Sequence, residues 1–319
     1  MARKRSTRFV QTHLANSHKK QAVLLNYCYL KSMTQKYIEV HDTHHHDFVK
    51  LYLPSQFSDR AFINACDGLV CLSNLESSII HIWNPSTKRL KLLPPPKKQL
   101  SRWYVPIGLG FDHISNDYKL LRISYKVQQD YTYAVEPELY SANSDSWKDI
   151  QIPKQLQQPS WSDMSKVVPA KSGLYMAILR ELIAFDLHNE EFHLYPFPIC
   201  EQYYHAMSEV LDFEGSVAMI FEKSNGSALS LYRLDDVCGK GSWTKMFNLE
   251  ADIKIDWVHH YLGLGQFIAY NYADGCVFNY DYKKGGTKKC GLKLNLDIKM
   301  GYPVKYVESL VSINGFERL

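Results

Sequence analysis

The chain has 319 residues, of which 45% are hydrophobic, 22% charged and 13% aromatic, and this composition excludes a disordered, collagenous or low-complexity protein. The first 20 residues hold six basic and no acidic side chains, so the net charge of +4 leaves 31 basic against 33 acidic residues in the remainder. Because a phosphate-binding groove needs clustered cations, we expect no nucleic-acid partner.

The first predicted element is a short helical segment within the basic residues 1–20. Residues 8–18 place Phe9, Val10 and Leu14 on one side of one or two helical turns. Beyond it, the dominant signal is short runs of β-branched, aromatic and other apolar residues bounded by turn residues. Clear examples are residues 68–73, 79–83, 118–124, 174–179, 182–187, 216–222 and 267–272. The chain is therefore predicted to be all-β.

An internal repeat organises these strands. An apolar strand, a polar turn and a second strand recur, and the turns begin near residues 42, 84, 141, 186, 233 and 281. The intervals are 42, 57, 45, 47 and 48 residues, which is typical of four-stranded propeller blades. Across three of the turns, bulky residues stand seven positions apart, as in Trp83 and Leu90. Structural packing roles are therefore predicted for Trp147, Phe192 and Trp243.

Six copies predict a six-bladed β-propeller-like ring over residues 21–315, preceded by the basic segment 1–20. The first copy lacks an innermost strand before residue 21, and the apolar run 305–313 is predicted to supply it. Such a pairing would close the ring, because an open ring leaves sheet edges exposed.

No motif of an enzyme or a metal site is found. His44, His45 and His46 are consecutive, and on an extended chain they point to alternate sides, which makes a poor metal site. The seven cysteines form no Cys-x-x-Cys pair, so neither a zinc site nor a disulfide framework is predicted. No apolar run reaches the ~18 residues of a membrane helix, and no signal core is present. We expect a soluble protein of the cytoplasm and/or nucleus with no catalytic residue, cofactor, metal or membrane contact.

The predicted links between blades are long and aromatic, whereas the hairpin turns carry small and charged residues. The links span residues 94–106, 152–166, 197–209, 248–260 and 296–305. Aromatic side chains on scaffolded loops favour protein binding, although single rings can instead pack into the blades. The predicted protein-binding residues are Trp103, Tyr104, Trp161, Tyr203, Tyr204, His205, Trp257, His259, His260 and Tyr302.

Several motifs together carry a resemblance to a known family. They are Cys66-Asp67-Gly68-Leu69-Val70-Cys71-Leu72, Ile82-Trp83-Asn84-Pro85-Ser86-Thr87-Lys88, Gly108-Leu109-Gly110-Phe111-Asp112, Glu138-Leu139-Tyr140-Ser141 and Tyr306-Val307-Glu308-Ser309-Leu310. In this order they resemble the plant F-box-associated domain of F-box/kelch-type proteins, which include S-locus F-box-like proteins. The resemblance spans residues 8–315.

The resemblance implies a kelch-like propeller that serves as the substrate receptor of an SCF-type ubiquitin ligase. In that family an F-box grips a Skp-type adaptor on a cullin scaffold, and the propeller binds an unknown target protein. Residues 8–14 resemble the stretch that follows an F-box, and F-box helices are not found before them. Adaptor binding is therefore expected only where an F-box is present elsewhere, and this chain is expected to be truncated.

Two other functions remain open. A kelch-like propeller enzyme, a hydrolase or an oxidase, would place carboxylates, histidines or metal ligands at one mouth of the ring. A truncated gene product would have no partner of its own. An aromatic face without such ligands favours the binding module.

Overall fold

The computed structural model consists of two compact units: Met1–Gln158 with Asp297–Leu319, and Pro159–Leu296. We call them unit 1 and unit 2 and describe each by itself. The structure describes residues 2–17, 22–26, 37–42, 48–52, 61–74, 79–98, 106–127, 133–156, 167–170, 173–178, 181–198, 203–205, 210–223, 229–237, 240–271, 273, 275–293 and 304–318.

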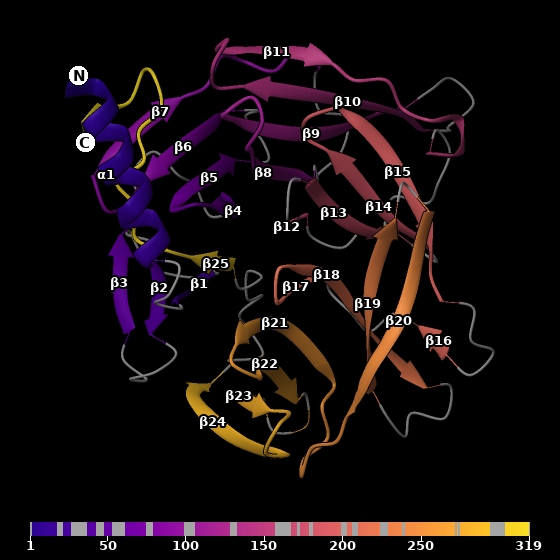
Figure 1. Ribbon diagram of the computed structural model, residues 1–319. Helices are drawn as coiled ribbons and strands as arrows, with labels where there is room; N and C mark the ends of the chain where they lie inside the picture. The colour runs from indigo at the N-terminus through magenta and orange to yellow at the C-terminus, as the bar shows by residue number, and fades with distance from the viewer. Residues whose placement is uncertain are drawn as a thin grey trace. The chain divides into compact units, whose positions relative to one another are not determined.

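In its described residues, unit 1 contains one α-helix and three antiparallel sheets (Figure 1). The helix is α1 (Ala2–Ser17), longer than the one or two turns predicted. One sheet has the order β25 (Val304–Tyr306), β1 (Ala22–Asn26), β2 (Tyr37–Asp42), β3 (Phe48–Tyr52). The second runs β26 (Glu317–Arg318), β7 (Arg89–Leu92), β6 (Ile80–Asn84), β5 (Leu69–Asn74), β4 (Ala61–Cys66). The third runs β11 (Ser146–Asp149), β10 (Tyr133–Ser141), β9 (Asp117–Val127), β8 (Ile107–Asp112), and a 3-10 turn, η1 (Lys154–Leu156), follows it.

The part of unit 2 that the structure describes contains three further antiparallel sheets (Figure 1). The first has the order β12 (Val168–Ala170), β13 (Gly173–Ile178), β14 (Glu181–Asp186), β15 (Glu191–Pro196). In the second, β16 (Tyr203–His205) and β17 (Val210–Phe213) both pair β18 (Ser216–Lys223), and β19 (Leu229–Val237) and β20 (Lys240–Leu249) follow. The third runs β21 (Trp257–Gly263), β22 (Gln266–Asn271), β23 (Cys276–Asp281), β24 (Gly286–Lys293).

The structure corrects the predicted number of blades. Two sheets of unit 1 and all three sheets of unit 2 are blades, each built on at least four strands that follow one another in the chain. The remaining sheet joins three N-terminal strands to β25 from the opposite end of the sequence, so it is no further copy of the repeat. The prediction of a six-bladed ring is therefore wrong: the fold is an all-β propeller with five blades and one short helix. Counting one blade for each of the six turns gave one blade too many, because the first copy is not a blade on its own.

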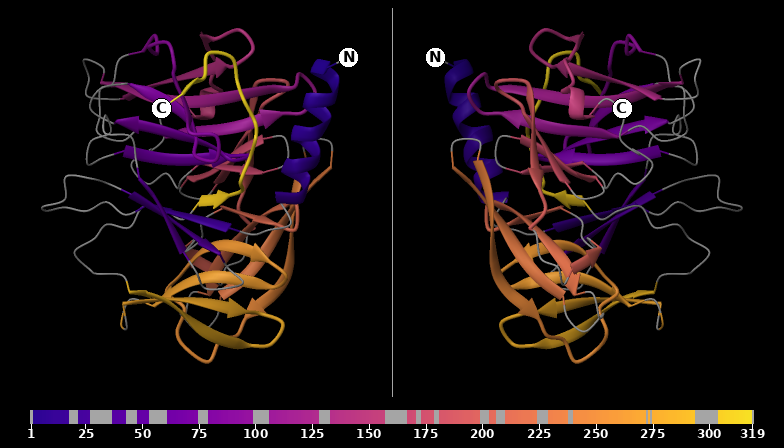
Figure 2. Two further views of the ribbon diagram at one scale, coloured as in Figure 1. Left: turned by 90° about the vertical axis from the view of Figure 1, so that its left-hand side faces the viewer. Right: turned by 90° about the vertical axis from the view of Figure 1, so that its right-hand side faces the viewer.

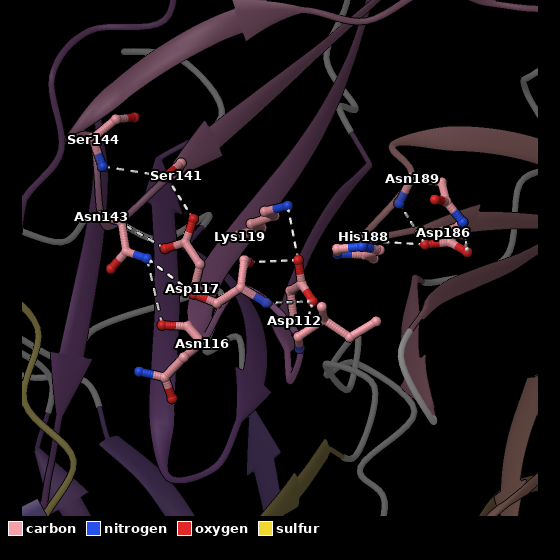
Figure 3. Close-up of polar contacts among 12 residues, drawn as sticks. Asp112, Asn116, Asp117, Lys119, Ser141, Asn143, Ser144, Asp186, His188 and Asn189 are labelled. Atoms are coloured by element: carbon pink, nitrogen blue, oxygen red, sulfur yellow. Dashed lines mark hydrogen bonds and ion pairs between the residues drawn. The ribbon is translucent and has the colours of Figure 1, made fainter.

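The repeat seen in the sequence is a recurring hairpin turn. An Asp or Asn at the end of one strand accepts backbone N–H bonds from the turn, as when Asp186 Oδ1 accepts from His188 N at 2.7 Å and Asn189 N at 2.9 Å (Figure 3). The residue four positions on then adopts a positive φ, which Asn, Asp and Gly tolerate best. These pairs are Asn84 and Lys88 (53°), Asp112 and Asn116 (52°), Asp186 and Glu190 (61°), and Asp281 and Gly285 (67°). The constant seven-residue spacing reflects this turn.

The C-terminal segment 304–318 completes unit 1. It begins with β25, which pairs β1 as predicted, and then crosses the sheets of this unit (Figure 2). Asn84 Nδ2 donates to the backbone oxygens of Ser309 at 3.0 Å and Val311 at 2.9 Å. The side chains of Val311 and Ile313 are buried in the core between the second and third sheets, against which Val10 and Leu14 of α1 also pack. We call residues 304–318 the C-terminal strap.

Two tryptophans each bond to the chain that precedes their blade. Trp147 on β11 donates its Nε1 proton to the Pro94 oxygen at 2.7 Å, and Trp243 on β20 donates to the Pro196 oxygen at 2.8 Å. Trp147 is buried against Tyr140, with ring centroids 5.5 Å apart, whereas Trp243 is half-buried. The structural roles predicted for these residues and for the buried Phe192 agree with this packing.

Trp147→Phe is expected to lower the free energy of unfolding by about 1–2 kcal/mol, because the Pro94 oxygen loses its donor while most of the ring packing remains. Urea denaturation measures the effect. Trp243→Phe is the matched control: it removes the same type of bond at a more exposed position and should cost less. An unchanged midpoint for Trp147→Phe would show that the bond contributes nothing.

Candidate functional site

The hairpin turns of the β8–β11 blade satisfy their own polar groups. Asp112 is 1% exposed; its Oδ1 accepts from the backbone N–H groups of Ile114 and Ser115, and its Oδ2 accepts from Lys119 Nζ at 3.1 Å (Figure 3). Burial alone would raise the pKa of Asp112, but hydrogen bonds from Ser115, Lys119 and the turn backbone outweigh it and hold the pKa below its usual range. This carboxylate is a structural group of the turn.

A second carboxylate ties neighbouring turns together. Asp117 Oδ2 accepts from Ser141 Oγ at 2.5 Å, and its Oδ1 accepts from Asn143 N at 2.9 Å. Asn143 Nδ2 in turn donates to the backbone oxygens of Ser115 and Asn116 (Figure 3). These bonds use the Ser141 hydroxyl and both carboxylate oxygens of Asp117 to join the two turns.

Asp112→Asn is expected to lower the free energy of unfolding at pH 7. The variant should also lose less of that free energy than the unmodified chain does when the pH is lowered. The folded-state pKa lies below the unfolded value of about 3.9, so the carboxylate stabilises the fold above that pH, and this contribution disappears as the pH falls toward the folded pKa. Melting temperatures at pH 7 and pH 3 measure the change. The exposed Glu191→Gln on β15 is the control. A variant that loses as much stability in acid as the unmodified chain would contradict this role.

Metal binding has no support in the part of the chain that the structure describes. There, no group of three or more His, Cys, Asp or Glu side chains is placed to hold a metal ion. His44, His45 and His46 lie outside the described residues. Within the same described part, no helix has the length and apolar character needed to cross a bilayer.

In unit 1, a buried ion pair clamps the beginning of the first link. Arg122 Nη1 donates to Glu138 Oε2 at 2.5 Å, and the two side chains are 1% and 0% exposed. Glu138 Oε1 also accepts from the backbone N–H groups of Lys97 at 2.7 Å and Lys98 at 3.0 Å, while Arg122 donates to the Lys98 oxygen at 3.1 Å. The backbone at residues 97–98 is thus held by charge-assisted bonds, and the Lys97 side chain remains exposed.

In unit 2, neutral hydrogen bonds hold the backbone of the link between β20 and β21. Its backbone oxygens accept from Tyr280 Oη at Glu250 and from Asn271 Nδ2 at Lys254, and Asp256 N donates to the Tyr270 oxygen. Its side chains alternate between the core and solvent: Ala251, Ile253 and Ile255 pack inward, while Glu250, Asp252 and Lys254 are exposed. The link therefore displays charged groups on a fixed backbone.

Strand β16 brings part of the link 197–209 to the end of β18, where it pairs through His205↔Glu222 and Tyr203↔Lys223. On the link between β20 and β21, Lys254 bonds Asp256 at 2.6 Å, and this partner raises the pKa of Lys254. Asp252 of the same link accepts from Thr287 Oγ1 on β24 at 2.6 Å.

The predicted binding residues are only partly described. Trp103, Tyr104, Trp161 and Tyr302 lie outside the described residues. Tyr203, Tyr204 and His205 lie on β16, where the structure describes the backbone. Trp257, His259 and His260 lie on β21, a strand and not a loop; Trp257 and His259 are half-buried with ring centroids 6.4 Å apart, and His260 is buried. The structure places these residues on strands of two neighbouring sheets of unit 2, and their binding role stays a prediction.

Sequence reasoning missed the residues that position the links. Arg122 and Glu138 lie in strands that were interpreted as apolar runs, and nothing local shows that they face each other across β9 and β10. The sequence does contain a pattern that could have predicted the hydrogen bonds of the two tryptophans. Both bonds end on the backbone oxygen of a proline that ends or follows an outer strand, Pro94 and Pro196. The pairing of each proline with a tryptophan about 50 residues on could have been sought as part of the repeat.

Comparison with known proteins gives one family. Residues 13–293 match the family model of the F-box associated beta propeller domain. Similar relatives in Arabidopsis thaliana include F-box protein CPR1, 25% identical over 213 residues that cover 58% of this chain and 51% of the relative. An F-box/LRR-repeat protein is 24% identical over 271 residues (78% and 61%), and an F-box/kelch-repeat protein is 23% identical over 203 residues (59% and 52%). The chain spans about half the length of the curated relatives it matches.

Solved structures with a similar fold are distant in sequence. TolB from Acinetobacter baumannii superposes with a TM-score of 0.55 at 9% identity, covering 91% of this chain and 67% of TolB. An oligogalacturonate lyase from Vibrio parahaemolyticus gives a TM-score of 0.50 at 8% identity, covering 84% and 78%. At such identities the likeness shows the fold alone.

Proposed function

The chain belongs to the F-box associated beta propeller domain family, and on that premise we propose that it is the substrate-recognition module of an SCF-type ubiquitin ligase. The observation that carries the proposal is the family match over residues 13–293, most of the chain. The relatives it matches are named as F-box proteins. In this proposal the propeller binds a target protein, and an F-box binds the Skp-type adaptor that joins the target to a cullin scaffold.

The arrangement of the links supports a role in protein binding. Loops that carry binding residues work best on a rigid scaffold, and the described parts of two links have their backbones held by buried side chains. The hairpin turns, in contrast, use their carboxylates and hydroxyls in bonds to their own backbone. We therefore place target binding on the link side of the blades, and we propose a cytoplasmic or nuclear location where ubiquitination takes place.

Fusing an F-box before Arg8 is expected to join target and adaptor in one complex. Purified adaptor should bind the fusion and should not bind residues 1–319 alone, since a helix-in-groove contact needs the apolar F-box helices. Target proteins captured by the fusion are identified by mass spectrometry, and ubiquitin transfer to them is then measured. Adaptor affinity of residues 1–319 equal to that of the fusion would contradict the division of roles.

Trp161→Ala with Tyr203→Ala is expected to weaken target capture at least tenfold, because aromatic anchors contribute about 2 kcal/mol each when desolvated. The matched control is Ile114→Ala with Leu264→Ala, two apolar side chains that are 71% and 72% exposed on turns between strands. Capture that survives the first pair and fails with the second would move the binding face to those turns.

A further inference from the structure

A run of three prolines follows β7 at the start of the first link. Its sequence is Leu93-Pro94-Pro95-Pro96, and within the described residues no peptide bond is cis. A proline ring fixes φ at about −65°, and a residue that precedes a proline is pushed out of the helical region. Pro94 and Pro95 meet both conditions, so their backbone is held in the polyproline II conformation.

Both ends of this run are anchored to unit 1. The N–H of Leu93 donates to the Ile80 oxygen at 2.9 Å, and the Pro94 oxygen accepts from Trp147 Nε1 at 2.7 Å. Beyond the run, the buried ion pair of this unit holds the backbone of residues 97–98. A segment that is already fixed in its bound conformation loses little conformational entropy when a partner binds it.

The run presents apolar side chains to solvent. Pro95 is exposed between two half-buried prolines, and Leu92, three residues earlier and thus one polyproline II turn away, is 60% exposed. Leu92 pairs His81 in register, and Ile79, on the same face of the sheet at the diagonal position, is 47% exposed. We call Ile79, Leu92 and Pro95 the proline ridge. Exposed apolar side chains that lie together in this way mark an interaction site.

The charge at one end of the proline ridge narrows the choice of partner. Lys97 is exposed while its backbone N–H is held by Glu138 at 2.7 Å, and Lys98 pairs Asp149 at 3.5 Å. The link 94–106 holds three basic residues and no acidic one. Because cations at a rim favour carboxylates on the partner, a fitting surface combines an apolar groove with acidic groups at one end.

We propose that the proline ridge binds a protein domain whose aromatic-lined groove accepts polyproline II and carries carboxylates at one end. Grooves of this kind bind Pro-rich segments because the polyproline II helix is formed in advance. The rings of the groove cover Leu92 and Pro95, and its carboxylates face Lys97. The inference rests on the proposed function, since it names the class of target that the link side recognises.

Binding of the full chain to an array of purified SH3 and WW domains tests the inference, because both domain types have aromatic grooves for polyproline II. At least one domain should bind, and Pro95→Ala should weaken this binding about tenfold, because it removes a ring at the centre of the contact. Pro196→Ala is the matched control: Pro196 is exposed and its oxygen also accepts from a tryptophan, but no proline adjoins it, so binding should not change.

Two outcomes would overturn the proposal. If no domain of the array binds, the proline run only stiffens the link. If Pro95→Ala and Pro196→Ala weaken binding equally, the proline ridge is not the contact. Urea midpoints of both variants should equal that of the unmodified chain, since both prolines are exposed, and this measurement separates a lost contact from a lost fold.

Lys97→Glu tests the charged end of the site. It reverses the charge beside the proline ridge and should weaken binding of the same domain about threefold or more. Lys88→Glu makes the same change of net charge on the exposed turn between β6 and β7, at the other end of these strands, and should have a smaller effect. Equal effects of both variants would mean that net charge alone acts and would contradict carboxylates opposite Lys97.

The F-box fusion separates failure of this inference from failure of the proposed function. If no domain of the array binds while the fusion still delivers ubiquitin to a captured target, the proline ridge is wrong and the recognition role stands. If a domain binds the proline ridge and the fusion binds the adaptor, yet the bound domain receives no ubiquitin, the recognition role is contradicted and the site stands.

Discussion

Glu138→Ala is expected to lower the free energy of unfolding by about 3–5 kcal/mol, because it leaves the guanidinium of Arg122 buried without its counterion. Arg122 is 1% exposed, and burial lowers its pKa while Glu138 opposes that shift. The backbone N–H groups of Lys97 and Lys98 lose their acceptor in the same variant. Urea denaturation measures the loss, and amide hydrogen exchange at residues 97 and 98 should become faster.

Two variants separate charge from hydrogen bonding in this cluster, and a third, at a more exposed ion pair on β19, is the control. Glu138→Gln keeps an acceptor oxygen for the two amides but removes the charge, so it tests the ion pair by itself. Arg122→Met with Glu138→Leu removes both charges and should cost less than Glu138→Ala, because no unpaired charge remains buried. Asp235→Ala breaks a pair whose side chains are 37% and 31% exposed and should change stability by about 1 kcal/mol or less. A loss under about 1 kcal/mol for Glu138→Ala would contradict the clamp.

Deleting residues 305–319 is expected to abolish cooperative unfolding of unit 1 and to cause aggregation. The deletion removes most of β25 and the buried side chains of the C-terminal strap, Val311 and Ile313 among them, and it exposes the edge of β1. It also leaves the buried Asn84 amide without the two backbone oxygens to which it donates. Calorimetry and light scattering measure the outcome. A truncated chain that melts like the full chain would show that the strap is dispensable.

Gly68→Ala gives a single-residue test of strap docking. At φ +78°, a Cβ on Gly68 would lie 2.3 Å from Ser309 Cβ and 2.4 Å from the Val307 oxygen, so the strap would have to move. Gly215 occupies the equivalent turn between β17 and β18 at φ +75°, where a Cβ would meet no atom within 4 Å. Gly215→Ala should therefore show only the backbone strain, about 1–2 kcal/mol, and Gly68→Ala should lose about 1–3 kcal/mol more. Equal losses would contradict close packing of the strap at Gly68.

Much of the fold could be predicted because its signals are local. The alternation of apolar residues predicted strands, and the spacing of turns predicted a repeat, since each hairpin turn depends on one Asp or Asn and one residue at positive φ. The count of blades was wrong because a turn shows where a hairpin lies and not whether its strands form a blade of their own; the first copy takes its fourth strand, β25, from the other end of the chain. Pairing of β25 with β1 was predicted from the missing strand, whereas the bonds from Asn84 to the strap were not.

The sequence by itself determined the all-β class, the repeating hairpins, the family and the aromatic, charged character of the links, because each of these depends on residues close together in the chain. Only the tertiary structure decided which distant groups meet. Arg122 faces Glu138 and reaches back to Lys98, Asn84 receives a strap that lies 225 residues further along the chain at Ser309, and β16 pairs β18 at Glu222. Such contacts depend on strand register and sheet order, and a shift of one residue would turn each side chain to the opposite face.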